Sequence, residues 1–91
     1  MFTVYVIQSQ AGKLYVGHTS DINRRLKEHN AGLCKSTRGS DKWRPIYIEV
    51  YSNRGEAIDR ERWLKSVYGR EFINAVIAGW GPQRKSKVAG S

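Results

Sequence analysis

The first apolar run of the chain, over residues 2–8, is rich in β-branched and aromatic side chains and predicts a β-strand. A shorter run of the same kind follows at 14–17. The polar segment 9–13 between them contains Gly12, which can adopt a positive φ in a turn. Two strands this close in sequence are expected to pair as an antiparallel hairpin.

Residues 46–51 alternate between apolar and more polar positions, which is the period of a strand. The apolar positions are Ile46, Ile48 and Val50, and the more polar ones are Tyr47, Glu49 and Tyr51. One face of this strand is therefore predicted to be wetter than the other. Pro45 stands at the entry, where a missing N–H costs least, so we predict that the strand begins after it.

Three helices are predicted between and after these strands. The first begins at residue 21 or 22 and ends before Gly32, which suits a left-handed cap. The second covers 54–68, and the third covers 70–78 after a break at Gly69. The inward stripe of the second helix is predicted to hold Ala57, Ile58, Leu64 and Tyr68.

The first predicted helix places two functional side chains close to its apolar face. At 3.6 residues per turn, Ile22, Leu26 and His29 share one face, and Arg25 lies beside them. In one interpretation the arginine stem runs along the edge of the stripe and the histidine packs as a half-buried ring. In the other, the two groups, four residues apart, belong to a functional site.

Glu61 lies in the middle of the apolar stripe of the second predicted helix. A carboxylate in such a place is costly unless it meets a cation or hydrogen-bond donors. Two interpretations are open: a structural ion pair with an inward Arg or Lys, or a metal ligand or acid–base group.

The charge balance indicates a polyanionic partner, because sixteen Lys and Arg face eight Asp and Glu in 91 residues, for a net charge of +8. Nucleic acid is the commonest such partner. Segment 33–43 is a basic loop carrying Lys35, Arg38 and Lys42, which suits phosphate contact but equally suits a solvated connector. We expect one folded domain over 1–80 and a basic, flexible tail at 81–91.

Cysteine usage and hydropathy bear on the compartment. Cys34 is the single cysteine, so it cannot form an internal disulfide, which fits a reducing cytosol. One Cys and two His also argue against a structural zinc site. Without a secretory signal or an apolar run of about 20 residues, we expect a cytoplasmic protein that does not span a membrane.

The unusual groups form a recognisable chemical set. They are Tyr5, Tyr15, Arg25, His29 and Glu61. Taken singly, each tyrosine is an ordinary cross-strand aromatic. Together, a carboxylate, a cation, a histidine and hydroxyl groups on a basic protein can cut a phosphodiester with one divalent ion. Mg²⁺ needs only one or two carboxylates, and an arginine matches two phosphate oxygens.

Several segments in order resemble the GIY-YIG endonuclease superfamily, in particular its small, single-domain bacterial members. The first signature corresponds to 4–6 and the second to 15–17, and the similarity continues through Gly32. The stretch 56–65 is similar to the acidic helix of the family. Val4 replaces the family glycine, and valine replaces isoleucine in both signatures, but no catalytic-type position is lost.

The resemblance implies an α+β fold in which about three helices flank a small three-stranded antiparallel sheet. It also implies hydrolysis of DNA that depends on Mg²⁺ or Mn²⁺. Glu61 would bind the metal and Arg25 would clamp the phosphate. Tyr5 and Tyr15 would hold or deprotonate the attacking water, with Tyr15 favoured as the base, and His29 would orient or relay the proton.

Three further positions are implied only by their place in the family pattern. His18 falls where some members carry a lysine near the phosphate, and Gly17 closes the second signature. Asn74 falls near a family asparagine that supports the site, although the spacing there is variable and a surface residue of the third helix is the favoured interpretation.

A DNA endonuclease is thus our first hypothesis. The second is a nucleic-acid-binding module with little or no cleavage, acting with a protein partner in DNA repair or recombination. A structural or protein-interaction domain is the third. The first hypothesis requires the two phenols, the guanidinium and the carboxylate to meet in one shallow pocket open to solvent.

Overall fold

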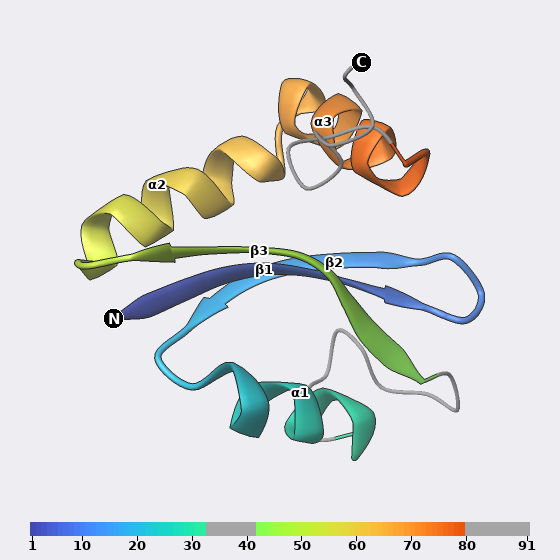
Figure 1. Cartoon of the computed structure of the whole chain (residues 1–91), viewed down its shortest axis with the longest axis horizontal. Coiled ribbons are helices and arrows are strands. Elements are labelled where there is room, and N and C mark those ends of the chain that lie inside the picture. Colours follow the sequence, from blue (N-terminus) through green and yellow to red (C-terminus); the bar gives the residue numbers. More distant parts are fainter. Residues whose placement is uncertain (33–41, 80–91) are drawn as a thin grey trace.

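The computed structural model describes residues 1–32 and 42–79 of the chain. It contains three strands and three helices within these ranges, in the order β1 (Phe2–Ser9), β2 (Leu14–Thr19), α1 (Ile22–Asn30), β3 (Trp43–Tyr51), α2 (Arg54–Leu64) and α3 (Val67–Ile77). The strands form one antiparallel sheet in the order β2-β1-β3. Helix α1 lies on one face of the sheet, and α2 and α3 lie on the other (Figure 1). The predicted α+β fold and its antiparallel hairpin are confirmed.

The central strand β1 divides the core into two halves. Val4 and Val6 pack against α2 and α3, whereas Tyr5 and Ile7 face α1. All four side chains are at most 1% exposed, because β1 has a strand on each side and helices on both faces. Strands β2 and β3 are both edge strands, and each leaves one edge of the sheet unpaired within the described residues.

Helix α1 begins and ends as the sequence predicts. Asp21 is the N-cap, and its carboxylate accepts a hydrogen bond from the backbone N–H of Arg24 at 3.1 Å. Gly32 follows the helix with a φ of 78°, which favours glycine. The side chain of Asn30 then binds both backbone groups of Trp43, at 2.7 Å to its N–H and 3.1 Å to its carbonyl. This contact fixes the start of β3 against the end of α1.

The predicted boundary between the second and third helices is wrong. The break comes at Lys65 and Ser66, whose hydroxyl caps α3 by accepting from the N–H of Gly69 at 3.2 Å. Gly69 lies inside α3, where a Cβ would stand 2.1 Å from the carbonyl oxygen of Trp63. Its glycine therefore serves close packing rather than termination. Tyr68, predicted to face inward, belongs to α3 and is 72% exposed.

Strand β3 also differs from its prediction in start and in sidedness. It begins at Trp43, before Pro45, and its register against β1 shifts between Val6 and Ile7. Its apolar side is the more open one, since Ile48 and Val50 are 51% and 53% exposed. The side of β3 that carries Glu49 is covered by α2. Arg60 of α2 neutralises the Glu49 carboxylate and so makes this burial tolerable.

The remaining predictions fall partly outside the described residues. The basic loop with Cys34, Lys35 and Arg38, and the tail at 81–91, lie there. Lys42 is described and is exposed directly before β3. No helix within residues 1–32 and 42–79 is long and apolar enough to cross a membrane.

Candidate active site at the edge of β2

One group of site residues lies between the hairpin and α1. Tyr5 points toward α1, and its hydroxyl lies 2.9 Å from Nε2 of His29; both side chains are 1% exposed. The ring of Tyr15 lies beside them, with its centroid 4.8 Å from that of the imidazole and 6.2 Å from that of Tyr5. The sequence left open whether His29 packs or belongs to a functional site. The structure shows that it packs as a fully buried ring in contact with both tyrosines, and its part in a functional site stays a prediction.

The absence of a side chain at Gly17 leaves room for the Tyr5 ring to lie over the backbone of β2. It pairs directly with Tyr5 in the register of β1 and β2. A Cβ at this position would stand 2.8 Å from the Tyr5 hydroxyl oxygen and 3.1 Å from the ring of Tyr15. The backbone of β2 therefore needs a residue without a side chain here, for reasons of space rather than of φ.

Burial sets the protonation of His29. Desolvation lowers the pKa of its imidazole below the ordinary value, and the positive charge of Arg25 lowers it further, against a smaller opposing effect of Glu28. A neutral imidazole has one N–H and one free nitrogen, so it either accepts from the Tyr5 hydroxyl or donates to it. His29 is thus suited to pass on a proton rather than to bind a phosphate as a cation.

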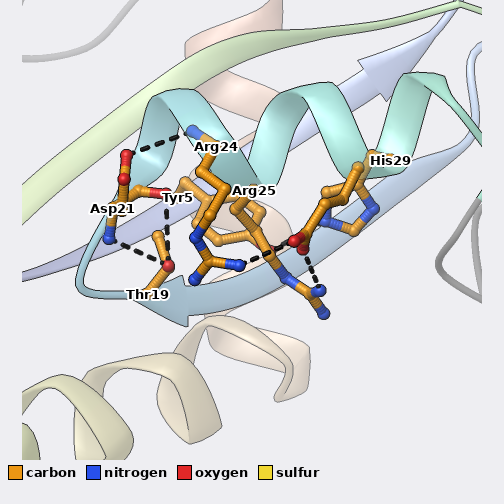
Figure 2. Close-up of polar contacts among 7 residues, drawn as sticks. Tyr5, Thr19, Asp21, Arg24, Arg25 and His29 are labelled. Atoms are coloured by element: carbon orange, nitrogen blue, oxygen red, sulfur yellow. Dashed lines mark hydrogen bonds and ion pairs between the residues drawn. The ribbon is translucent and has the colours of Figure 1, made fainter.

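Arg25 stands at the edge of the α1 stripe with its side chain 33% exposed. Its Nη1 donates to Oε1 of Glu28 at 2.9 Å, and Nη1 of Arg24 donates to Oε2 of the same carboxylate at 2.6 Å. Figure 2 shows the two arginine side chains extending from neighbouring positions of α1 on the same side of the helix. The hydrogen bond from Arg25 is the main cause that lowers the pKa of Glu28 below its ordinary value.

The second group lies on the other side of the sheet, around Glu61 of α2. His18 Nδ1 lies 2.5 Å from Oε1 of Glu61, and Lys65 Nζ lies 2.5 Å from its Oε2. Burial raises the pKa of the Glu61 carboxyl, but the hydrogen bonds from His18 and Lys65 outweigh it, so the pKa falls below the ordinary value. The Glu61 side chain is therefore ionised at neutral pH, and it is 18% exposed.

The single pocket that the nuclease hypothesis requires, with both phenols, the guanidinium and the carboxylate, is not formed by the described residues. That hypothesis therefore loses its original geometric condition and keeps only the approach of the two groups at the edge of β2. Side chains alternate along a strand, so Tyr15 and Gly17 face α1 while His18 faces α2. Helix α2, which carries Glu61, lies on the opposite face of the sheet from α1, whose His29 binds Tyr5 (Figure 1). The two groups are joined by β2 itself, where Gly17 and His18 are consecutive residues.

The free edge of β2 is where both groups come closest to solvent. Tyr15 contacts His29 on one side and also lines a groove with Lys65, the partner of Glu61, on the other. Tyr15 is half-buried, whereas Tyr5 is fully buried. Of the two phenols, Tyr15 is therefore the one that a ligand at this edge can reach.

The residues present fit a divalent cation only as a site with few protein ligands. Within the described ranges no three His, Cys, Asp or Glu side chains gather around a common point. Mg²⁺ accepts such sites, since it binds one or two carboxylates and keeps its waters. Glu61 offers two hard oxygens at a solvent-accessible edge, and both now accept hydrogen bonds from cationic or imidazole groups that a metal would have to displace.

Two contributors were missed by the sequence analysis. Glu28 was not among the predicted site residues, yet it binds both Arg24 and Arg25 of α1. Lys65 binds Glu61 from the next turn of α2. Spacings of three and four residues between opposite charges would have indicated both contacts. Asn74 is exposed on α3, and its side chain makes no hydrogen bond to any described residue.

Comparison with known proteins bears on this arrangement directly. The family model described as the GIY-YIG catalytic domain matches residues 1–74. The chain belongs to the GIY-YIG family. The match includes both signature strands and the part of α2 that carries Glu61, so the resemblance predicted from the motifs is confirmed over most of the chain.

Relatives within this family share the domain over most of their length. The UPF0213 protein of Haloquadratum walsbyi is 41% identical over 69 residues, which cover 75% of this chain and 76% of that protein. The UPF0213 protein of Clostridium perfringens is 35% identical over 74 residues, which cover 80% of each. The solution structure of the UPF0213 protein BH0048 from Bacillus halodurans has a TM-score of 0.52 at 29% identity, covering 97% of this chain and 96% of that one.

Proposed function

We propose that this GIY-YIG protein is an endonuclease that hydrolyses DNA phosphodiester bonds with one divalent cation, Mg²⁺ or Mn²⁺. The observation that carries the proposal is the edge of β2. Strand β2 carries both His18, which binds the Glu61 carboxylate, and Tyr15, whose ring contacts the buried His29. The net charge of +8 supplies the attraction for a polyanion. We place the activity in the cytoplasm, which the single cysteine fits.

Each residue at the edge then has a role of its own. Tyr15, the accessible phenol, holds or deprotonates the water that attacks phosphorus. His29 passes on the proton, and Tyr5 keeps the imidazole in place through its buried hydrogen bond. Arg25 turns from Glu28 to bind the phosphate oxygens, for which its planar donors are well suited.

Glu61 is the residue that would hold the metal, with His18 next to it on the phosphate side. A divalent cation there would polarise the phosphate and neutralise charge on the leaving oxygen. The P–O bond to the leaving oxygen breaks as the bond to the water oxygen forms. The lowered pKa of Glu61 keeps the carboxylate ionised for this purpose.

A nucleic-acid-binding module with little or no cleavage is the second candidate. It is favoured by the full pairing of Glu61, whose two oxygens are satisfied by His18 and Lys65 as in a structural ion pair. Glu61 also belongs to α2, which lies on the opposite face of the sheet from α1 and its Tyr5–His29 contact. Such a module would act with a protein partner in DNA repair or recombination.

Plasmid nicking separates the two candidates. With Mg²⁺ we expect the wild type to convert supercoiled plasmid to the nicked form and EDTA to stop it. Glu61→Gln should lose at least about 10²-fold in rate, the scale for removing one well-placed electrostatic group. Glu71→Gln, an exposed carboxylate of α3, is the matched control and should cleave normally. Salt-dependent binding without nicking by any of the proteins would establish the binding module instead.

A further inference from the structure

A groove runs from the free edge of β2 to the junction of α2 and α3, beside the candidate active site. Its cavity volume is about 220 Å³. Val16, Leu64 and Ile73 contribute an apolar floor, and Tyr15, Lys65 and Arg70 contribute polar groups. Lys65 and Tyr15 connect this groove directly to the two groups of site residues described above.

The side chain of Arg70 makes no polar contact with the rest of the residues that the structure describes. Three other arginines of the described residues are paired with carboxylates: Arg24 and Arg25 bind Glu28, and Arg60 binds Glu49 at 2.9 Å. The guanidinium of Arg70 makes no hydrogen bond or ion pair with any residue that the structure describes, and the side chain is exposed. An uncommitted arginine that lines a groove is available to a ligand.

The electrostatics of the groove favour an anion. Lys65 Nζ gives one of its three donors to Glu61 and keeps two. Arg70 lies four residues after the N-cap of α3, and the first turn of that helix carries no acidic side chain. The positive end of the helix dipole adds to the two cations. The apolar floor, by contrast, suits a sugar or another weakly polar surface.

We infer that this groove takes the sugar–phosphate backbone next to the cleaved bond, with Arg70 and Lys65 binding the flanking phosphate. The inference rests on the proposed function and adds to it a second phosphate position and a positioning residue, Arg70. Its consequence is that the substrate strand leaves the β2 edge toward α3 rather than along α1. Arg70 would then set the register of the strand without touching the reacting atoms.

The salt dependence of binding tests the inference without any need for cleavage. The probe is a fluorescein-labelled DNA oligonucleotide that the wild type cleaves, and anisotropy is measured in EDTA over a range of salt. Arg70→Ala should reduce the slope of log affinity against log salt by about one and weaken binding about tenfold at 0.1 M salt. Arg70→Lys should keep the slope. Arg54→Ala, at the far end of α2 where Arg54 lies over Phe2, should keep it as well.

A neutral linkage in the DNA locates the contact. Methylphosphonates are placed one at a time along the probe, and each is combined with wild type and with Arg70→Ala. A methylphosphonate at one position next to the cleaved bond should weaken DNA binding by the wild type. It should not weaken binding by Arg70→Ala any further, because the two changes remove the same contact. Unchanged slopes, equal loss in Arg70→Ala and Arg54→Ala, or no coupled position would overturn the inference while wild-type cleavage leaves the endonuclease standing. A wild type that neither binds nor cleaves DNA would remove both.

Discussion

The hydroxyl of Tyr5 and Nε2 of His29 form a hydrogen bond of 2.9 Å in the interior of the protein, between the central strand and α1. Both groups are polar, both are 1% exposed, and both come from positions that sequence reasoning assigned to chemistry. A buried polar pair is stable only while each partner satisfies the other. This bond therefore links the stability of the domain to the state of its candidate site.

Removing the hydroxyl should make that link visible. Tyr5→Phe removes the hydroxyl that is bonded to Nε2 of a buried imidazole, and we expect a loss of about 1–3 kcal/mol in the free energy of unfolding. Urea denaturation measures it. Tyr68→Phe removes a hydroxyl from a side chain that is 72% exposed and should change stability by less than about 0.5 kcal/mol. Equal losses in both variants would show that the buried bond contributes nothing special.

The lowered pKa of His29 predicts a direction for pH dependence. The unfolded chain takes up a proton on this imidazole near its ordinary value of about 6.5, while the folded protein resists it to lower pH. The unfolded state thus binds more protons in this window, and stability falls as pH is lowered through about 6.5. Unfolding free energies at pH 7.5 and pH 5 should differ by less in His29→Gln than in the wild type.

Glu49 and Glu61 do not contribute to the change in stability between pH 7.5 and pH 5. Glu49 and Glu61 have pKa values below the ordinary 4.5, since hydrogen bonds from Arg60 and Tyr47, and from His18 and Lys65, outweigh burial in each case. Their contribution is complete above about 4.5 and is lost only at lower pH. A wild-type slope between pH 7.5 and pH 5 that survives in His29→Gln would contradict the role given to the imidazole.

Gly17→Ala tests the close approach of Tyr5 to β2. The new methyl would stand 2.8 Å from a hydroxyl oxygen that its bond to His29 holds in place, so we expect about 1–3 kcal/mol of destabilisation. Combining it with Tyr5→Phe should cost less than the sum of the single changes, because the second change removes the obstructing atom. Thermal melts of the four proteins give this comparison. Strict additivity would mean that the strain lies elsewhere.

Two glycines in helices should respond in opposite ways to the same substitution. Gly69→Ala places a methyl 2.1 Å from a backbone oxygen at the α2–α3 junction, and we expect a loss of more than about 3 kcal/mol or no folded protein. Gly55→Ala is its control in α2, where the nearest atom is 3.5 Å away, and it should stabilise by about 0.4–1 kcal/mol. Circular dichroism of both proteins decides this. A tolerated Gly69→Ala would refute the packing role.

Arg25→Ala should separate phosphate binding from folding. The side chain is a third exposed, so the fold should persist, while nicking should fall by about 10²-fold or more. Arg24→Ala removes the neighbouring partner of Glu28 and should leave nicking within a few-fold of wild type. Nicking rates and circular dichroism are measured together. Loss of the fold in Arg25→Ala would assign the residue to the core instead.

The sequence predicted the elements well where local chemistry decides them. The caps at Asp21 and Gly32 and the hairpin around Gly12 follow from side chains that act on their own neighbourhood. The boundary at Ser66 was missed because a glycine was taken for a terminator, when Gly69 is required by the approach of a second helix. That requirement comes from tertiary packing and has no local signature.

For the candidate site, the structure bears on how the predicted residues are arranged, and their roles stay predictions. The contact of Tyr5, Tyr15 and His29 agrees with the motif, yet His18 and Glu61 turned out to lie on the other face. The opposite facing of Tyr15 and His18 could have been predicted from the sequence, because odd and even positions of one strand point to opposite faces of the sheet. The covered side of β3 could not be foreseen, since only the approach of Arg60 makes it favourable to bury Glu49.

The clamp between Asn30 and the backbone of Trp43 has a consequence for how such a domain diversifies. Because the side chain of Asn30 ties the end of α1 to the start of β3, the number of residues between these two elements can change without moving either of them. Doubling a closed loop costs only about 0.6 kcal/mol in entropy. Evolution, or an engineer, can therefore change the length or the charge of the connection between α1 and β3 while the sheet and its helices stay in place.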